Sequence, residues 1–191
     1  MQCDLDVILR RKLKHYNIPH HAHELTFSCE HHSAYLREET PCRIFLEELA
    51  LAKREFEFYI WAYVLMPTHV HLLIYPKNEV YNISRILYKI KGKTSTRYRH
   101  WIRENRPEDF EAFCVMSRQK KTFRFWQAGG GFDRNLWNAK AIHYSIRYIE
   151  GNPVRAGIVT QPEDWLWSSA RARALRTGLI PDTVQIPLFM L

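Results

Sequence analysis

The chain has 191 residues, of which 46% are hydrophobic, and it carries a formal net charge of +8. This length is typical of one domain, and no apolar run approaches the ~18 residues that a membrane span needs. The four cysteines form no Cys-x-x-Cys pair, and the first residues lack the shape of a signal peptide. We therefore expect a reduced, cytoplasmic protein without a membrane partner.

The positive charge is concentrated in the middle of the chain. Residues 81–126 contain 12 Lys and Arg against 4 Asp and Glu, whereas the rest of the chain holds 16 residues of each sign. A local excess of positive charge indicates a polyanionic partner, with nucleic acid ahead of a membrane surface. The alternative interpretation is a helix face that is merely solvated.

Helical and strand patterns alternate along the chain. Apolar periodicity, turn residues and β-branched or aromatic runs define the expected elements. They are a strand at 23–29, a helix at 43–52, strands at 56–66 and 70–75, a helix at 83–102, a strand at 122–127 and a helix at 138–149. The two central strands form a hairpin, so we predict an α+β fold in which helices cover an antiparallel sheet.

Two histidines lie near the start of the second hairpin strand. His69 and His71 flank Val70, and residues two apart project from the same face of a strand. The pair would give a divalent metal two ligands on a rigid platform. The alternative is two polar residues on the solvated face of an edge strand.

The stretch from Lys91 to Ser95, Lys-Gly-Lys-Thr-Ser, resembles the end of a phosphate-binding P-loop. That motif needs a glycine five residues before Gly92, where this chain has Leu87. The stretch also lies within the predicted helix rather than after a strand, so we reject the P-loop interpretation.

The helix predicted at 138–149 carries two apolar stripes. Ile142, Ile146 and Ile149 form one stripe, and a second stripe lies about 130° away around the helix. The second stripe consists of Trp137, Ala141, Tyr144 and Tyr148. Tyr148 thus lies outside the stripe that most simply packs on a core, and it is free to face a site. Burial of both stripes is the alternative.

Four blocks of sequence occur in a characteristic order: Trp61 to Leu73, Phe125-Trp126 followed by Phe132 to Arg134, Tyr148 to Val159, and Pro162 to Ser169. In these blocks the chain resembles the HUH single-strand DNA nucleases and, within them, the REP-associated tyrosine transposases of the one-tyrosine group. This resemblance covers roughly residues 20–172, so we expect one domain at 20–172, a basic lead-in at 1–19 and a tail at 173–191. The chain departs from the family at Thr68, where asparagine is common.

The resemblance implies a ferredoxin-like HUH fold and a tyrosine nucleophile. It assigns the nucleophile to Tyr148 and the metal ligands to His69, His71 and Asn152, with Mg²⁺ or Mn²⁺ as the metal. Attack on DNA would give a 5′-phosphotyrosine intermediate and a free 3′-hydroxyl. The implied substrate is single-stranded DNA beside a REP-like hairpin, and the implied protein is a nucleoid-associated monomer rather than a homodimer.

Three alternatives stay open. Tyr144 and Tyr148 also have the spacing of a two-tyrosine replication initiator, although we expect Tyr144 to be structural. The second alternative is a protein with the same fold that binds DNA hairpins without cleaving them. The third is a zinc-binding or RNA-binding module, which would bind zinc tightly or prefer RNA to DNA. The residues expected to contact DNA are Arg85, Lys89, Lys93, Arg97, Arg99 and Arg155.

Overall fold

A four-stranded antiparallel sheet forms the centre of the computed structural model, which describes residues 15–117, 119–182 and 184. Its strand order is β2-β3-β1-β6, and every neighbouring pair is antiparallel. The strands are β1 (Ala22–Ser28), β2 (Phe58–Met66), β3 (His69–Pro76) and β6 (Phe132–Leu136). A separate two-stranded hairpin joins β4 (Cys114–Ser117) to β5 (Lys120–Phe123).

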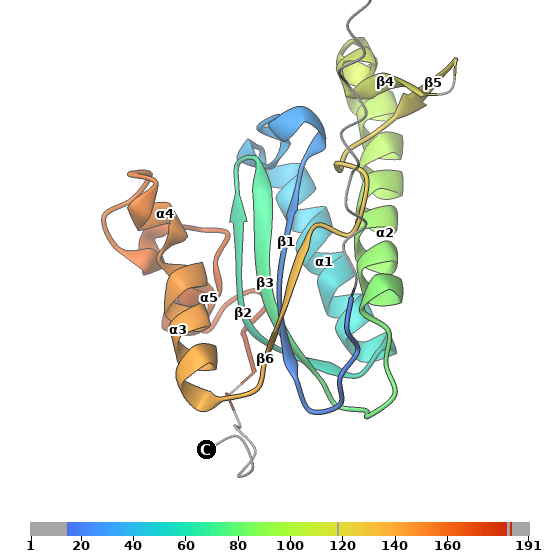
Figure 1. Cartoon of the computed structure of the whole chain (residues 1–191). Coiled ribbons are helices and arrows are strands. Elements are labelled where there is room, and N and C mark those ends of the chain that lie inside the picture. The colour runs from blue at the N-terminus through green and yellow to red at the C-terminus, as the bar shows by residue number, and fades with distance from the viewer. Residues whose placement is uncertain (1–14, 118, 183, 185–191) are drawn as a thin grey trace, which may run out of the picture.

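Helices cover both faces of the central sheet (Figure 1). The helices α1 (Glu39–Glu55) and α2 (Ile83–Asn105) cover one face, and α3 (Ala139–Glu150) and α4 (Asn152–Arg155) lie on the other. The helix α5 (Ser169–Leu175) lies at the β2 edge, where its Ala172 joins the cluster of the α1–α2 face. Short 3₁₀ segments are η1 (Glu30–His32), η2 (Tyr35–Arg37), η3 (Pro107–Phe113) and η4 (Pro162–Asp164). The predicted α+β class with an antiparallel sheet and flanking helices is confirmed.

The sheet separates two hydrophobic clusters. Along β3, Val70, Leu72 and Ile74 pack toward α1 and α2, whereas Leu73 and Tyr75 pack toward α3. This alternation follows from the pleat of the strand. The histidines at positions 69 and 71 therefore share the α3 face, at the end of the strand where the apolar packing stops.

The chain beyond β5 differs from the expected strand at 122–127. The strand β5 ends at Phe123, and Trp126 makes only an isolated bridge with Cys29. The edge strand β6 was not expected, because three of its five residues are Asp133, Arg134 and Asn135. The Asp133 carboxylate is buried and binds His15 and His23 at 2.6 and 2.8 Å, so tertiary contacts stabilise a polar sequence as a strand.

Contacts with the sheet extend to both sides of the predicted domain at 20–172. His15, which binds Asp133 of β6, precedes that range, and Asp182 follows it. The Ile60 amide of β2 donates to the Asp182 carboxylate at 2.8 Å, and Lys53 of α1 pairs with the same carboxylate at 2.7 Å.

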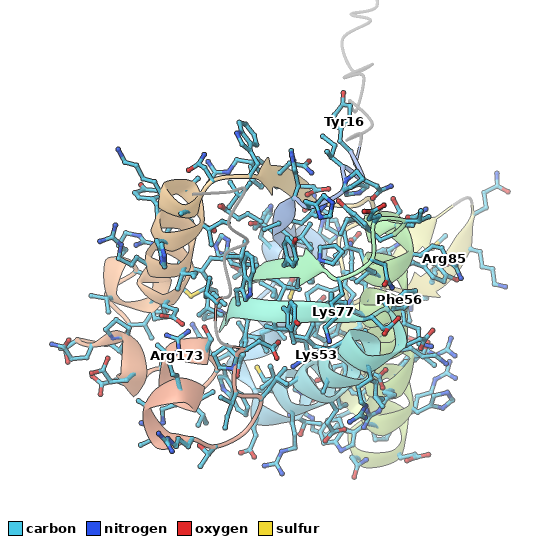
Figure 2. The ribbon with its side chains drawn as sticks, turned by 90° about the horizontal axis from the view of Figure 1, so that it is seen from below. Tyr16, Lys53, Phe56, Lys77, Arg85 and Arg173 are labelled. Atoms are coloured by element: carbon cyan, nitrogen blue, oxygen red, sulfur yellow. The ribbon has the colours of Figure 1, made fainter. Side chains whose placement is uncertain are left out.

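Figure 2 shows Arg85 on the α2 side and Arg173 on the opposite, α5 side of the molecule. No helix in the described part of the chain is long and apolar enough to cross a bilayer.

Candidate active site

The two histidines of β3 point their Nε2 atoms at each other. These atoms are 3.1 Å apart, and the ring centroids are 4.8 Å apart with nearly perpendicular planes. His71 is buried, with 7% of its surface exposed, and His69 is partly exposed. The His71 imidazole is therefore buried against the sheet, and solvent reaches the pair through His69.

Threonine hydroxyls bind the other nitrogen of each ring. His71 Nδ1 lies 2.8 Å from Thr26 Oγ1 on β1, and His69 Nδ1 lies 2.9 Å from Thr68 Oγ1 in the turn before β3. A hydroxyl that accepts from Nδ1–H leaves the Nε2 lone pair available to a metal and fixes the ring orientation. Thr26 is brought to His71 by the antiparallel register of β1 and β3.

Both imidazoles favour their neutral form. Burial is the main cause that lowers the pKa of His71 to about 4, with further contributions from His69 and Arg155. Burial also lowers the pKa of His69, followed by the effect of His32. Neutral imidazole is the form that ligates metals, so the pair is ready to bind a cation at neutral pH.

The donor set suits a divalent ion. Two nitrogens 3.1 Å apart, each about 2.1 Å from one ion, would subtend about 95° at the metal, between octahedral and tetrahedral geometry. The described residues contain no group of three or more His, Cys, Asp and Glu side chains that could hold a metal. Oxygen ligands of other kinds, from side-chain amides, hydroxyls or the backbone, are chemically suited to complete such a site.

Tyr148 extends from α3 to His71. Its ring packs edge-on against His71 with centroids 5.8 Å apart, and it remains 37% exposed. Ile142, Ile146 and Ile149 anchor this helix in the α3-face cluster, as predicted. The alternative in which both stripes are buried is wrong, because Trp137 and Tyr144 are 59% and 60% exposed.

Tyr144 and Tyr148 lie one turn apart on α3 but have different surroundings. No described contact joins Tyr144 to either histidine, whereas Tyr148 touches His71. The arrangement therefore distinguishes two tyrosines that the sequence presents at equivalent positions of one stripe.

Arg155 folds back from α4 onto Tyr148. Its guanidinium lies 4.3 Å from the centroid of the Tyr148 ring, and it donates a hydrogen bond to the Tyr148 carbonyl. Gly151 permits this approach, because a Cβ there would lie 2.9 Å from both the Arg147 carbonyl oxygen and an Arg155 guanidinium nitrogen. The glycine thus lets a positive charge lie against the tyrosine.

Asn152 lies one turn beyond Tyr148. Its amide nitrogen donates to the carbonyl oxygens of Tyr148 and Ile149, at 2.9 and 3.4 Å. These bonds hold the side chain at the C-terminal end of α3 and leave the amide oxygen as its acceptor for a ligand. No described contact links Asn152 with the histidines, so its assignment as third ligand stays a prediction.

The basic residues predicted to contact DNA are not equivalent in the structure. Lys89 pairs with Glu55 at 2.5 Å, and Arg97 pairs with Glu47 at 2.5 Å and with the buried Glu48 at 2.9 Å. Their charge is therefore partly balanced by α1. The side chains of Arg85 and Lys93 are exposed, Arg99 is half-buried, and Arg155 lies at Tyr148.

Comparison with known proteins identifies the family of this chain. Residues 19–127, more than half of the chain, match the family described as "Transposase IS200 like". The chain belongs to the IS200-like transposases. The matched residues include both histidines and end before Tyr148. Membership of this family gives the chain a transposase-like, DNA-processing role, and no curated protein matches the sequence.

One solved structure supports the predicted fold. The chain is similar to the REP-associated tyrosine transposase that was solved bound to a REP hairpin, with a TM-score of 0.65 and 20% identity over 92% of this chain and 93% of that one. A putative transposase from Deinococcus radiodurans R1 is also similar, with a TM-score of 0.45 and 16% identity over 73% and 96% of the two chains. The fold expected from the resemblance is confirmed by the first of these structures.

Two residues of the site escaped the sequence-based prediction. Thr26 belongs to the first strand and is 45 residues from His71, so only the strand register connects them. Gly151 directly follows α3, and its lack of a side chain makes room for Arg155. A threonine in a strand and a glycine after a helix are common, and neither pattern indicates such a contact.

Proposed function

We propose that this chain is a metal-dependent, site-specific endonuclease and strand transferase for single-stranded DNA, acting beside a REP-type hairpin. The observation that carries the proposal is the contact between the Tyr148 ring and His71, whose imidazole is paired with that of His69. A nucleophile beside a two-histidine donor set supplies two of the parts of metal-assisted phosphodiester cleavage by tyrosine. The transposase family and the hairpin bound to the similar structure support this choice of substrate.

In the proposed reaction, the Tyr148 oxygen attacks the scissile phosphorus. The new tyrosine–phosphorus bond forms as the bond from phosphorus to the 3′ oxygen breaks; the tyrosine loses its proton and the 3′ oxygen gains one. The product is a 5′-phosphotyrosine, which keeps the bond energy needed to rejoin the DNA. Arg155, which stacks on the tyrosine ring, supplies positive charge beside the incoming phosphate.

His69 and His71 would hold the ion through their Nε2 atoms, with the Asn152 amide oxygen as the proposed third ligand. A Mg²⁺ or Mn²⁺ ion at this position would supply Lewis-acid polarisation of the scissile phosphate. Thr26 and Thr68 keep the two imidazoles in the orientation that the ion requires. We also propose that the chain acts as a monomer, with all of these residues supplied by one copy.

End-labelled DNA tests the function directly. A single-stranded oligonucleotide that contains a REP-type hairpin and its flank is labelled separately at each end and incubated with the protein and Mn²⁺. We expect a denaturation-resistant protein–DNA adduct that carries the 3′-terminal label, because the 5′-phosphate side of the cut stays on the tyrosine. EDTA should prevent the adduct. Tight hairpin binding without adduct at any metal concentration would instead favour a non-cleaving binding protein.

A further inference from the structure

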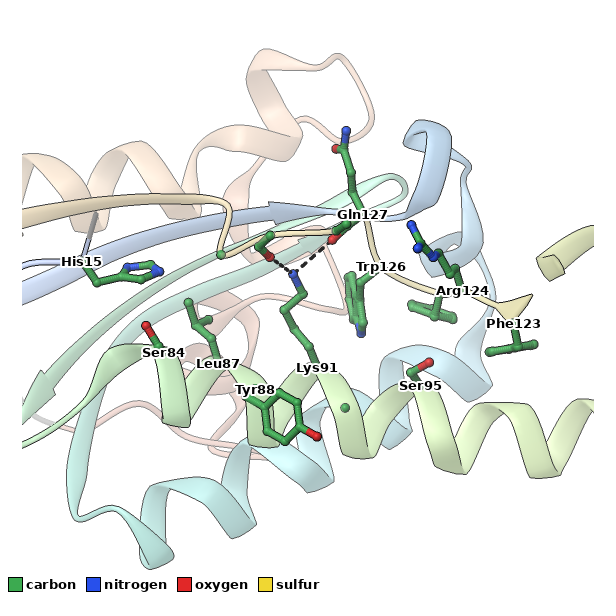
Figure 3. Close-up of a pocket in the computed structure, with 15 residues that line it drawn as sticks. His15, Ser84, Leu87, Tyr88, Lys91, Ser95, Phe123, Arg124, Trp126 and Gln127 are labelled. Atoms are coloured by element: carbon green, nitrogen blue, oxygen red, sulfur yellow. Dashed lines mark hydrogen bonds between the residues drawn. The ribbon is translucent and has the colours of Figure 1, made fainter. Parts of the chain in front are cut away.

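A cavity of about 560 Å³ lies between α2 and residues 123–130, on the side of the sheet opposite Tyr148 (Figure 3). The helix lines it with one face, because the contributing positions are three or four residues apart. These positions are Ser84, Leu87, Tyr88, Lys91, Gly92 and Ser95. The cavity therefore uses part of the stretch that resembled a P-loop, in a different structural setting.

Lys91 holds the far wall of the cavity in place. Its amine donates to the carbonyl oxygens of Gln127 and Gly129, at 3.3 and 2.7 Å, as Figure 3 shows. Trp126 of the same wall is buried and packs edge-on against Phe27. These contacts make the cavity a preformed feature of the fold rather than a gap that a loop movement would close.

The floor of the cavity is open at Gly92. This glycine lies inside the 23-residue helix α2, where a glycine is unfavourable, and a Cβ added to it would meet nothing within 4 Å. Tyr88, one turn earlier, lies beside the opening and is 82% exposed. An exposed aromatic ring next to bare helix backbone forms a flat surface that a planar group can cover.

The chemistry of the lining favours an anionic ligand with an aromatic ring. Lys91 and Arg124 line the cavity, and Arg124 also pairs with Glu30, which is not among the described lining residues, at 3.7 Å. A volume of this size lies within the range of small-ligand sites and accommodates one nucleotide. Aromatic stacking together with positive charge is how proteins bind single-stranded nucleic acid.

The cavity lies close to the edge of the sheet that leads to the active site. The backbone amide of Gln127 donates to the backbone carbonyl of Ser28 at 2.9 Å, and Ser28 pairs with His69 in the β1–β3 register. The wall of the cavity is thus aligned with the histidine end of β3, while the cavity itself opens on the other face.

We propose that this cavity binds one unpaired nucleotide of the DNA strand that the chain processes, with its base against Tyr88 and Gly92 and its phosphate in the positive field of Lys91 and Arg124. The proposal rests on the proposed function for the identity of the strand. It adds a second contact with the strand, on the face of the sheet opposite the nucleophile, which would help to select and hold the DNA.

Filling the cavity is the sharpest test. Gly92→Leu adds a side chain where the helix has space, so it should raise the melting temperature while blocking the nucleotide. Thr96→Leu adds the same side chain one turn later, at an exposed position outside the cavity, and serves as control. Fluorescence anisotropy with a labelled single-stranded oligonucleotide should show binding weakened about tenfold by Gly92→Leu, as expected for one lost stacking contact, and unchanged by Thr96→Leu.

Two further measurements make the result decisive. Tyr88→Ala changes an exposed side chain and should weaken binding by a similar factor, even if Gly92→Leu proves difficult to fold. Equal affinity of wild type, Gly92→Leu and Tyr88→Ala would overturn the proposal. Free deoxynucleoside monophosphates should bind far more weakly than the oligonucleotide, and equal affinity would show that the ligand is a free nucleotide rather than the DNA strand.

The outcome for the cavity is separable from the outcome for the proposed function. Loss of oligonucleotide binding in Gly92→Leu, with no adduct from the wild type, would support the cavity and reject the nuclease. A wild-type adduct, with full affinity in Gly92→Leu, would support the nuclease and reject the cavity.

Discussion

The two faces of the central sheet both carry basic and aromatic side chains, yet they use them differently. On the α3 face, Tyr148 contacts both His71 and Arg155 and remains partly exposed. On the α1–α2 face, Arg97 pairs with glutamates of α1. The comparison shows that one basic run of the sequence contains residues whose charge the fold balances with glutamates of α1, such as Lys89 and Arg97, and residues that lie exposed, such as Arg85.

The largest effect is expected on the α3 face, from removal of a single oxygen. Tyr148→Phe should abolish the covalent adduct while binding of hairpin DNA survives, because the ring and its packing against His71 remain. Tyr144→Phe is the matched control from the same stripe and should keep most cleavage. Adduct formation is read on denaturing gels, and an adduct from Tyr148→Phe would show that another residue is the nucleophile.

The next effect concerns the support of the histidine pair. Thr26→Val removes the hydroxyl that binds His71 Nδ1 and nearly preserves the side-chain volume. Mn²⁺ affinity, measured by calorimetry, should fall about 10- to 100-fold, as for other residues that orient metal ligands. His71→Ala should abolish binding at this site. Unchanged Mn²⁺ affinity in both variants would place the metal elsewhere or remove it from the mechanism.

Gly151 links the tyrosine to its neighbouring cation. Gly151→Ala should displace Arg155 from the ring, because the new Cβ would lie too close to the guanidinium. We expect the rate of cleavage to fall about tenfold, equivalent to roughly 1.4 kcal/mol of transition-state stabilisation. Single-turnover kinetics measure this rate, and Arg155→Ala should give a similar loss. A full rate in both variants would mean that the charge of Arg155 does not assist the reaction.

On the α1–α2 face, two arginines of α2 should behave in opposite ways. Arg97→Ala leaves the buried Glu48 without its partner, so it should lower the free energy of unfolding by roughly 1–2 kcal/mol and change DNA binding little. Arg85→Ala should leave stability unchanged but lower the salt dependence of DNA binding by about one unit of slope. Equal salt slopes in wild type and Arg85→Ala would indicate that this part of α2 is only solvated.

The smallest effect is a pH dependence of stability. Burial lowers the pKa of Lys91 to about 8 in the folded protein, below its ordinary value of 10.5. Between these values the unfolded chain binds more protons, so Lys91 should make stability rise with pH, by on the order of 1 kcal/mol. Denaturant unfolding of wild type and Lys91→Met at pH 7 and pH 10 measures the difference, which isolates Lys91 from other titrating groups. An identical pH trend in both proteins would contradict the burial of a charged amine.

Local sequence periodicity determined on which face of their strand or helix several key side chains lie. Alternation along a strand places His69 and His71 on one face whatever surrounds them, and the isoleucine stripe of α3 determines which side of that helix packs on the sheet. Both features depend on residues within a few positions of each other. The family resemblance added the assignment of Tyr148, which the spacing of the stripe left equal to Tyr144.

Only the tertiary structure decided which distant residues meet. The register of β1 against β3 brings Thr26 to His71, and the packing of α1 on α2 gives Arg97 its glutamate partners. The polar strand β6 and the cavity at Gly92 likewise depend on contacts far apart in the chain. Such contacts follow from the free energy of the whole fold, because no single residue pattern records which partner a buried or charged group will find.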